Sequence, residues 1–226
     1  ETANGSFPKE AVNMQALICS NAEAGVDYAS TYNHIRKFTK KPVSSAEGIC
    51  NSASQAAIDT GASLVVVFTD SFAPAQIISK YRPPCPVIVV TNDVKTAAHC
   101  NSTFALYPYL LSTPVKSVEK TIGQVLHYAT SMGLMIGLQE NPLVVVVSGR
   151  KEIMAKGHEI NNLMLETLVC GDRDDQTIKR RKIAKPIYEG QYTITYSSTR
   201  VGLDNICDPC KNVRKTKVVC TMGPKC

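Results

Sequence analysis

The fold of this chain is decided by the stretch Ser63-Leu64-Val65-Val66-Val67-Phe68, which runs into the turn Thr69-Asp70-Ser71. An apolar run of this length, without polar alternation, predicts a strand that is buried on both faces. Two further runs of the same kind follow at Val87–Thr91 and Leu143–Val147. Strands of this type that are separated by helices indicate a parallel sheet with helices on both faces.

Helical patterns fill the spaces between these strands. The clearest starts are the capping box from Ser44 to Glu47, whose helix is predicted to end at Gly61, and the Thr113-Pro114 pair, whose helix is predicted to end at Gly133. Further helices are expected to begin at Pro8, at Ala73 and at Asn92-Asp93, and a short strand is expected over Phe104–Tyr107. The Pro8 helix carries Met14, Leu17 and Ile18 on one face.

The last predicted strand is Asn161–Leu168, which follows a Gly-rich, basic loop over residues 148–158. This loop is too short to hold a crossover helix, so the last strand is expected to run antiparallel to its neighbour. The expected fold is therefore a three-layer α/β domain with a mostly parallel sheet over residues 8–168.

The chain changes character after Val169. Residues 170–182 are charged and aperiodic, which is typical of a linker, and Gln191–Ser197 alternates as an exposed strand would. Lys215–Met222 is predicted to be a buried strand that ends in a Gly-Pro turn. Because this tail is too short to form a core of its own, we expect it to belong to a larger domain, and we expect both chain ends to be internal positions of a longer protein.

Composition limits the class of protein. With 226 residues, 44% of them hydrophobic, and apolar runs of only a few residues, neither a membrane span nor a signal peptide is predicted. The nine cysteines are an odd number, which favours reduced thiols and a cytoplasmic location. The net charge of +6 suits phosphorylated small molecules as partners at least as well as nucleic acid.

Three segments carry a resemblance to a known family. The opening segment Glu1-Thr2-Ala3-Asn4-Gly5-Ser6-Phe7-Pro8-Lys9-Glu10-Ala11-Val12 resembles the turn from the last barrel strand of pyruvate kinase into its following helix. The segment Arg214-Lys215-Thr216-Lys217-Val218-Val219-Cys220-Thr221-Met222-Gly223-Pro224 is similar to the first barrel strand of the same family. Tyr81-Arg82-Pro83, after a Val-rich strand, resembles the C-terminal domain of that family.

The resemblance implies four parts: the end of a catalytic (β/α)8 barrel at residues 1–20, a C-terminal α/β regulatory domain at 21–168, a linker at 169–211 and the start of a second or permuted barrel at 212–226. This order is the reverse of the order in the family. Tandem fusion of two kinase units, circular permutation and an assembly artefact all remain open as explanations.

The resemblance also implies the chemistry of the longer protein. Pyruvate kinases transfer the phosphoryl group of phosphoenolpyruvate to ADP in glycolysis, giving pyruvate and ATP, with Mg²⁺ and usually K⁺, and they are usually cytoplasmic homotetramers. Such transfer needs metals and cations that neutralise charge on the phosphoryl group. The family motifs that supply them, Arg-x-Asn-x-Ser, Lys-x-Glu and Ala-Arg-Gly-Asp-Leu-Gly, do not occur in this sequence. We therefore assign no catalytic residue and expect this stretch alone to be inactive.

The family resemblance places an effector site, for a phosphate of a sugar bisphosphate, at the turn Thr69-Asp70-Ser71 with Ala73. A free helix N-terminus at that turn would favour an anion. The basic loop adds Arg150, Lys151 and Lys156. Phe72 stands where many family members have Gly, and the sequence has no Trp. Two alternatives stay open: that Thr69 and Ser71 only cap a helix while the loop is solvated, and that the chain is a non-catalytic module that binds sugar phosphates.

Three remaining features carry weaker predictions. The resemblance places Thr221 and Pro224 near the adenine of the nucleotide, although a plain strand end is an equal interpretation. Cys207 and Cys210 have metal-ligand spacing, but a structural zinc site needs four ligands and we assign no metal site. The basic run Lys179–Lys182 has no interleaved aromatic residues, so a solvated linker is favoured over a nucleic-acid contact.

Overall fold

The structure, a computed structural model, describes residues 2–112, 118–135, 142–153, 159–169 and 213–223. Its centre is a five-stranded sheet in the order β3-β2-β1-β4-β5. The strands are β1 (Leu64–Phe68), β2 (Val87–Thr91), β3 (Leu106–Leu110), β4 (Leu143–Ile153) and β5 (Glu159–Val169). Strands β1 to β4 are parallel to one another and β5 is antiparallel to β4, so the predicted mostly parallel sheet and the direction of its last strand are confirmed.

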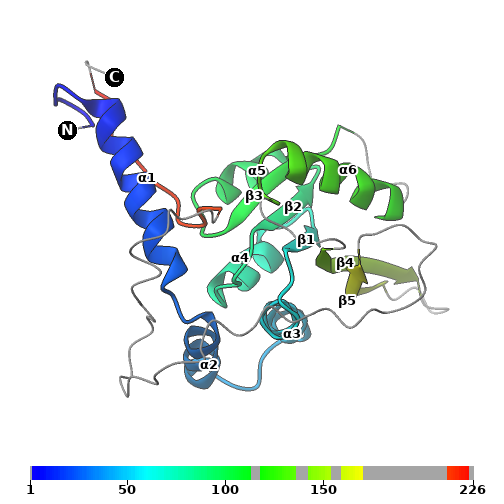
Figure 1. The fold of residues 1–226 in the computed structure, drawn as a ribbon. Helices are drawn as coiled ribbons and strands as arrows, with labels where there is room; N and C mark the ends of the chain where they lie inside the picture. Colours follow the sequence, from blue (N-terminus) through cyan, green and yellow to red (C-terminus); the bar gives the residue numbers. More distant parts are fainter. Residues whose placement is uncertain (1, 113–117, 136–141, 154–158, 170–212, 224–226) are drawn as a thin grey trace.

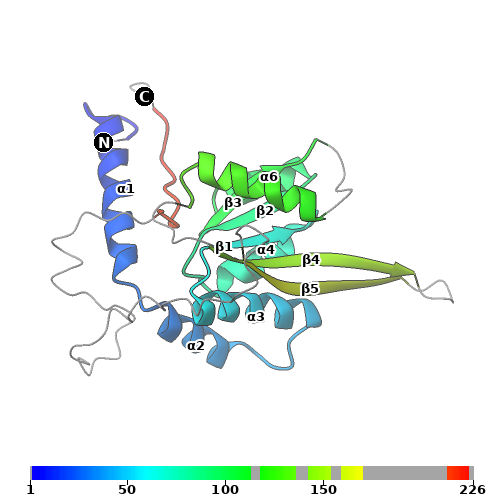
Figure 2. The same cartoon turned by 45° about the vertical axis from the view of Figure 1, so that its right-hand side comes forward.

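Helices cover the two faces of this sheet (Figures 1 and 2). Helices α3 (Ser45–Thr60) and α4 (Phe72–Lys80) lie on one face, and α6 (Val118–Ser131) lies on the other. Alternate residues of β1 point to opposite sides: Val65 and Val67 pack with α3 and α4, and Leu64 and Val66 pack with α6. This alternation explains why the strand has to be apolar throughout. The predicted three-layer α/β fold is therefore confirmed.

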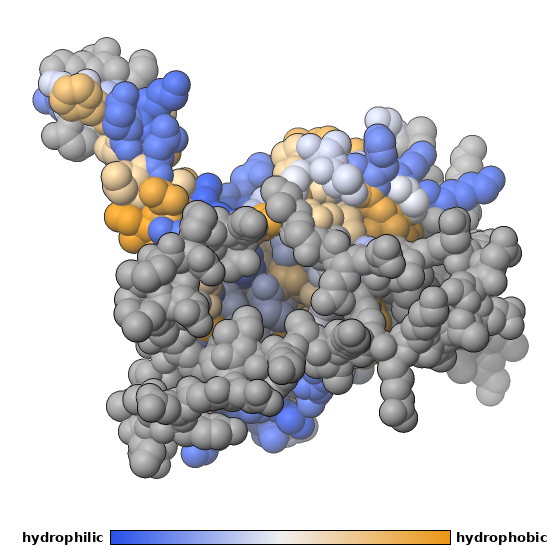
Figure 3. Space-filling view, in the orientation of Figure 1, coloured by the Kyte–Doolittle hydropathy of each residue, from blue (hydrophilic) through white to orange (hydrophobic). Residues whose placement is uncertain are grey.

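The remaining helices are α1 (Pro8–Ala24), α2 (Tyr28–Phe38) and α5 (Val94–Cys100). Helix α1 projects away from the sheet in both ribbon views. Met14, Leu17 and Ile18 share a face, as predicted, but they are 55–59% exposed. Figure 3 shows apolar side chains gathered on the lower part of this helix. No helix among the described residues combines the length and the apolar character that crossing a membrane requires.

Three sequence predictions are corrected by the structure, and one helix was missed. Residues 148–153 continue β4 instead of belonging to a loop, because the β4–β5 ladder runs on to the pair Ile153–Glu159. Helix α2 was not predicted. Strand β3 lies two to three residues later than expected. Lys215–Met222 forms no strand, and it leaves Val219 84% and Met222 78% exposed, because no described strand lies beside it.

Candidate functional site

The turn after β1 lies at the carboxyl edge of the parallel sheet. Thr69 continues the strand, since its N–H donates to the carbonyl of Val90 at 3.0 Å. Its hydroxyl then donates to the carbonyl of Ser71 at 2.8 Å and accepts the Ser71 N–H at 3.2 Å. Ser71 is the residue before α4, but no side chain caps that helix by a hydrogen bond. Thr69 therefore shapes the turn, and the interpretation of both residues as simple helix caps is wrong for the Ser71 side chain.

Two carboxylates stand next to this turn. Asp70 accepts the N–H of Asn92 at 3.1 Å, which ties the turn to the loop between β2 and α5. Asp93 caps α5 by accepting the N–H groups of Thr96 at 2.8 Å and of Lys95 at 3.3 Å. The backbone hydrogen bond from Thr96 is the main reason why the pKa of Asp93 is lowered, so Asp93 is ionised at neutral pH. An anion at this turn would therefore meet negative charge on one side.

The first turn of α4 offers fewer donors than an ordinary helix start. Pro74, its third residue, has no N–H, so Phe72 and Ala73 supply the leading donors. The ring of Phe72 lies 5.2 Å from the ring of His99, and it packs against the core cluster beneath α3 and α4. Phe72, which stands where many members of the resembled family have Gly, thus places a bulky side chain at the edge of the turn.

The basic part of the predicted effector site lies on the β4–β5 hairpin. Arg150 and Lys151 are strand residues, paired with Asn162 and Asn161, and their side chains are not described. Because β4 pairs with β1 only up to Val147, this part of β4 extends past the carboxyl end of β1, on the same edge as Thr69 (Figure 2). Lys156 lies outside the described residues. Of the predicted effector-site residues, those whose side chains the structure describes are Thr69, Asp70, Ser71 and Ala73, and they lie within one turn.

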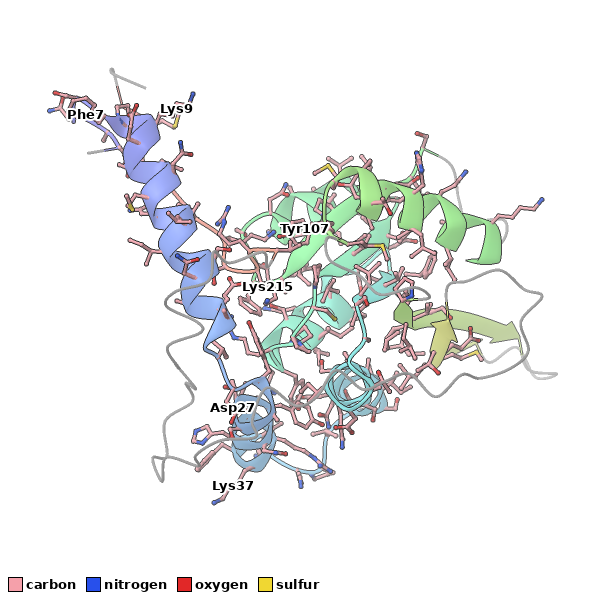
Figure 4. The ribbon with its side chains drawn as sticks, viewed as in Figure 1. Phe7, Lys9, Asp27, Lys37, Tyr107 and Lys215 are labelled. Atoms are coloured by element: carbon pink, nitrogen blue, oxygen red, sulfur yellow. The ribbon has the colours of Figure 1, made fainter. Side chains whose placement is uncertain are left out.

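A second polar site, which the sequence analysis missed, joins the two ends of the chain. Glu23, near the end of α1, is only 5% exposed, and its carboxylate accepts the N–H groups of Lys215 and Thr216 at 2.6–2.9 Å. The ammonium group of Lys215, itself buried, lies 3.3 Å from the same carboxylate. Figure 4 shows Lys215 between α1 and the sheet, with Tyr107 nearby. The buried carboxylate of Glu23 is thus hydrogen-bonded and neutralised by the ammonium of Lys215, as a buried charge requires.

Strand β3 and its leading residue complete this second site. Ala105 donates its N–H to the carbonyl of Lys215 at 2.8 Å, and Tyr107 donates its hydroxyl to the carbonyl of Arg214. The ammonium of Lys217 lies 3.7 Å from the centre of the Tyr107 ring. Burial, and then the charge of Arg214, lower the pKa of Lys217 to about 8. The site thus holds a basic segment through its backbone and its charges together.

The other predicted features find less support. Thr221 is exposed on the extended tail, while Pro224, Cys207 and Cys210 lie outside the described residues. Within the described part of the chain, no group of three or more His, Cys, Asp or Glu could hold a metal ion. An open hollow of about 600 Å³ lies elsewhere, between α6 and the end of β3, and contains no predicted site residue. Its lining is Tyr109, Lys120, Gly123, Gln124, His127, Tyr128 and Ser131.

Comparison with known proteins identifies the family. The model of the family described as "Pyruvate kinase, alpha/beta domain" matches residues 47–164, which run from the first turn of α3 to the middle of β5. The chain belongs to the pyruvate kinase family. Pyruvate kinase from Dictyostelium discoideum is 36% identical over 155 residues, which are 67% of this chain and 30% of that protein. Pyruvate kinase from Leishmania mexicana is 35% identical over 103 residues, which are 46% of this chain and 21% of that protein.

A solved structure supports the same assignment. Cryptosporidium parvum pyruvate kinase in complex with ADP superimposes with a TM-score of 0.66 at 30% identity, over 75% of this chain and 32% of that one. The chain therefore spans about a third of the length of the pyruvate kinases it matches. The part that matches the family model is the α/β domain, in agreement with the resemblance carried by Tyr81-Arg82-Pro83.

The sequence contained only a faint signal for the Glu23 site. Glu23 stands among small residues at the end of a helix, two residues before Gly25, where an acidic side chain opposes the helix dipole. An unfavourable charge at such a position indicates that the side chain has a specific partner elsewhere in the fold. Its partner, however, lies 192 residues away, and no local pattern could identify it.

Proposed function

We propose that this chain is the C-terminal α/β domain of a pyruvate kinase whose barrel transfers the phosphoryl group of phosphoenolpyruvate to ADP. The observation that carries the proposal is the match of residues 47–164 to the family, together with the order of strands in the sheet. The motifs that bind the metals and the phosphates do not occur in this sequence. Catalysis therefore belongs to the rest of the longer protein, and this domain supports or regulates it.

The test compares the 226-residue chain with the longer polypeptide. Pyruvate formation from phosphoenolpyruvate and ADP is followed with both proteins, with and without Mg²⁺ and K⁺. We expect the longer polypeptide to require both ions and the isolated chain to form no pyruvate above background. Pyruvate formed by the isolated chain, or no activity in the longer polypeptide under all ionic conditions, contradicts the proposal.

We also propose that the longer protein is a cytoplasmic homotetramer. The cysteines that the structure describes carry free thiols, as expected in a reducing compartment. Light scattering of the longer protein gives its mass directly. A monomer at micromolar concentration contradicts the tetramer.

A second proposed function is effector binding at the carboxyl edge of β1. It is supported by the position of the Thr69–Ser71 turn at the start of α4 and by the β4–β5 hairpin, which extends along the same edge with Arg150 and Lys151. The ligand class is a sugar bisphosphate. Pro74, Phe72 and the neighbouring Asp70 all oppose tight binding of a phosphate, so the affinity is expected to be lower than in a site with a glycine-rich turn.

Calorimetric titration of the chain with a hexose bisphosphate tests this site. Ser71→Glu places a carboxylate at the turn and is expected to abolish binding through charge repulsion. Ser102→Glu is the matched control, because Ser102 is exposed and lies before β3, at the opposite edge of the sheet. No saturable heat with the unaltered chain, or equal binding by Ser71→Glu, contradicts effector binding at this turn.

A further inference from the structure

The described C-terminal segment, residues 213–223, runs along α1 toward the N-terminus of the chain (Figures 1 and 2). From Lys215 to Gly223, an extended backbone covers about 26 Å at about 3.3 Å per residue. Helix α1, with 17 residues, has nearly the same length at 1.5 Å per residue, about 25 Å. The segment and the helix therefore match in length, and both ends of the segment can be held at once.

The first end is held at Glu23. Its carboxylate accepts from two successive backbone N–H groups, those of Lys215 and Thr216, and it neutralises a buried ammonium. Backbone donors alone would accept any sequence, whereas the ammonium contact selects a lysine at position 215. Ala105 adds a bond of the kind that joins neighbouring strands, because its N–H donates to the Lys215 carbonyl.

The second end is held at Gly223. A Cβ atom at this position would overlap the carbonyl oxygen of Ala3, so the backbone of the segment touches the turn before α1. Only glycine permits such an approach. The contact brings together the two motifs that resemble the end and the beginning of a barrel, Glu1–Val12 and Arg214–Pro224.

We propose that Glu23, Ala105 and Tyr107 form a recognition site for the basic segment Arg214–Lys217, and that this site binds the segment of its own chain. The segment that resembles a first barrel strand thereby belongs to the unit whose last barrel helix is α1. Circular permutation, or strand exchange between tandem units, produces this arrangement, while two tandem units with separate barrels do not. The statement about the barrel rests on the proposed function, but the docking of the segment does not.

Attachment to the same chain favours docking of the chain's own segment Arg214–Lys217 over docking of the same segment from a second copy. A tethered segment reaches its site at an effective concentration that is typically in the millimolar range. A segment from another molecule competes only when the protein itself approaches that concentration. Docking within one chain is therefore expected to be independent of dilution.

Hydrogen exchange of the full 226-residue chain, read by mass spectrometry or NMR, tests the proposal. The informative amides are those of Ala105, Lys215 and Thr216, because each donates to a group across the site. Glu23→Gln is expected to speed exchange of all three at least tenfold, while the amides of β1 and β2 keep their protection. Glu10→Gln is the matched control, because Glu10 lies on the same helix and is exposed, and it is expected to change none of them.

Dilution of the unaltered chain distinguishes docking of the chain's own segment from docking of the segment of a second copy. Unchanged protection of Ala105 over a hundredfold dilution supports docking within the chain, and loss of protection on dilution shows a second copy and overturns the proposal. Unchanged exchange at all three amides in Glu23→Gln also overturns the proposal.

If Glu23→Gln lowers the protection of β1 and β2 as well, Tyr107→Phe replaces Glu23→Gln as the test. Exchange at Ala105 that is no faster in Tyr107→Phe overturns the proposal. These results do not depend on pyruvate formation, so failure of the docking and failure of the enzymatic proposal are distinguishable.

Discussion

At the scale of single residues, two glycines, one inside helix α3 and one directly after it, have opposite conformational requirements. Gly61 ends the helix with φ of 61°, a left-handed conformation that costs about 1 kcal/mol or more in a residue with a Cβ. Gly48 lies inside the helix, and no atom stands within 4 Å of the position its Cβ would take. We expect Gly61→Ala to lower the free energy of unfolding by about 1 kcal/mol and Gly48→Ala to raise it by about 0.5–1 kcal/mol. Urea unfolding of both variants measures these changes, and a change in the free energy of unfolding with the same sign in both variants contradicts the prediction.

Lys217 makes docking of the C-terminal segment dependent on pH. Its pKa is about 8 in the docked segment, against an ordinary 10.5, chiefly because of burial. The docked state therefore disfavours the charged ammonium: the penalty is complete below pH 8 and is relieved as the pH rises from 8 toward 10.5. Burial raises the pKa of the neighbouring Tyr107 and Cys100 above their ordinary values, so neither group titrates between pH 7 and pH 9.

The expected result is docking up to about tenfold stronger at pH 9 than at pH 7. It is measured as the protection factor of the Ala105 amide, corrected for the intrinsic rate at each pH. Lys217→Met has no ammonium and is the control that should remove the dependence. A dependence that survives in this variant assigns the titration to another group.

At the scale of elements, helix α2 depends on its first residue. Asp27, before the helix, accepts the N–H and the hydroxyl of Ser30 at 3.1 and 2.8 Å and is buried. Asp27→Ala removes this cap and is expected to lower the free energy of unfolding by about 1–2 kcal/mol. Asp59→Ala is the control: this exposed aspartate lies in the last turn of α3, where it opposes the helix dipole, so its removal should be neutral or slightly stabilising. Equal losses in the two variants would refute the role of the cap.

The same elements show what the sequence could and could not predict. Strands β1, β2 and the first half of β4 were predictable, because burial on both faces requires an unbroken apolar run. Helix α2 escaped prediction because its inner face consists of Tyr28, Tyr32 and Ile35, spaced as a helix requires but set among polar and β-branched residues. The strand predicted over Lys215–Met222 has an apolar pattern suited to a barrel, but no strand among the described residues pairs with it.

At the scale of the whole molecule, the two candidate sites differ in how far apart their residues lie in sequence. The Thr69 turn was predictable, because a family resemblance and a parallel sheet both point to the carboxyl end of β1. The Glu23 site was not, because its partners come from near the two ends of the chain, 192 residues apart in sequence. Long-range polar contacts of this kind leave no periodic pattern in the sequence.

Docking of the C-terminal segment also has a consequence for cysteines across the molecule. Lys215 lies close enough to Cys85, and Lys217 to Cys100, for each ammonium to act on the thiol, yet burial still raises the pKa of Cys85 to about 12 and that of Cys100 to about 11. Cys50, a residue of α3, is equally buried, but the pKa of its thiol is raised by burial and by Glu47, with no contribution from the segment. Release of the segment should therefore expose Cys85 and Cys100 while Cys50 remains covered.

Glu23→Gln is expected to increase the rate at which Cys85 and Cys100 react with a thiol reagent by at least tenfold at pH 8, because water and reagent reach thiols that the segment otherwise covers. Mass spectrometry of the labelled peptides identifies each cysteine, and the unchanged rate of Cys50 shows that the sheet is still folded. Faster labelling of all three cysteines would mean that the whole domain has opened. Unchanged labelling of Cys85 and Cys100 in a variant that has lost protection at Ala105 would show that the sheet and α5 bury these thiols without help from the segment.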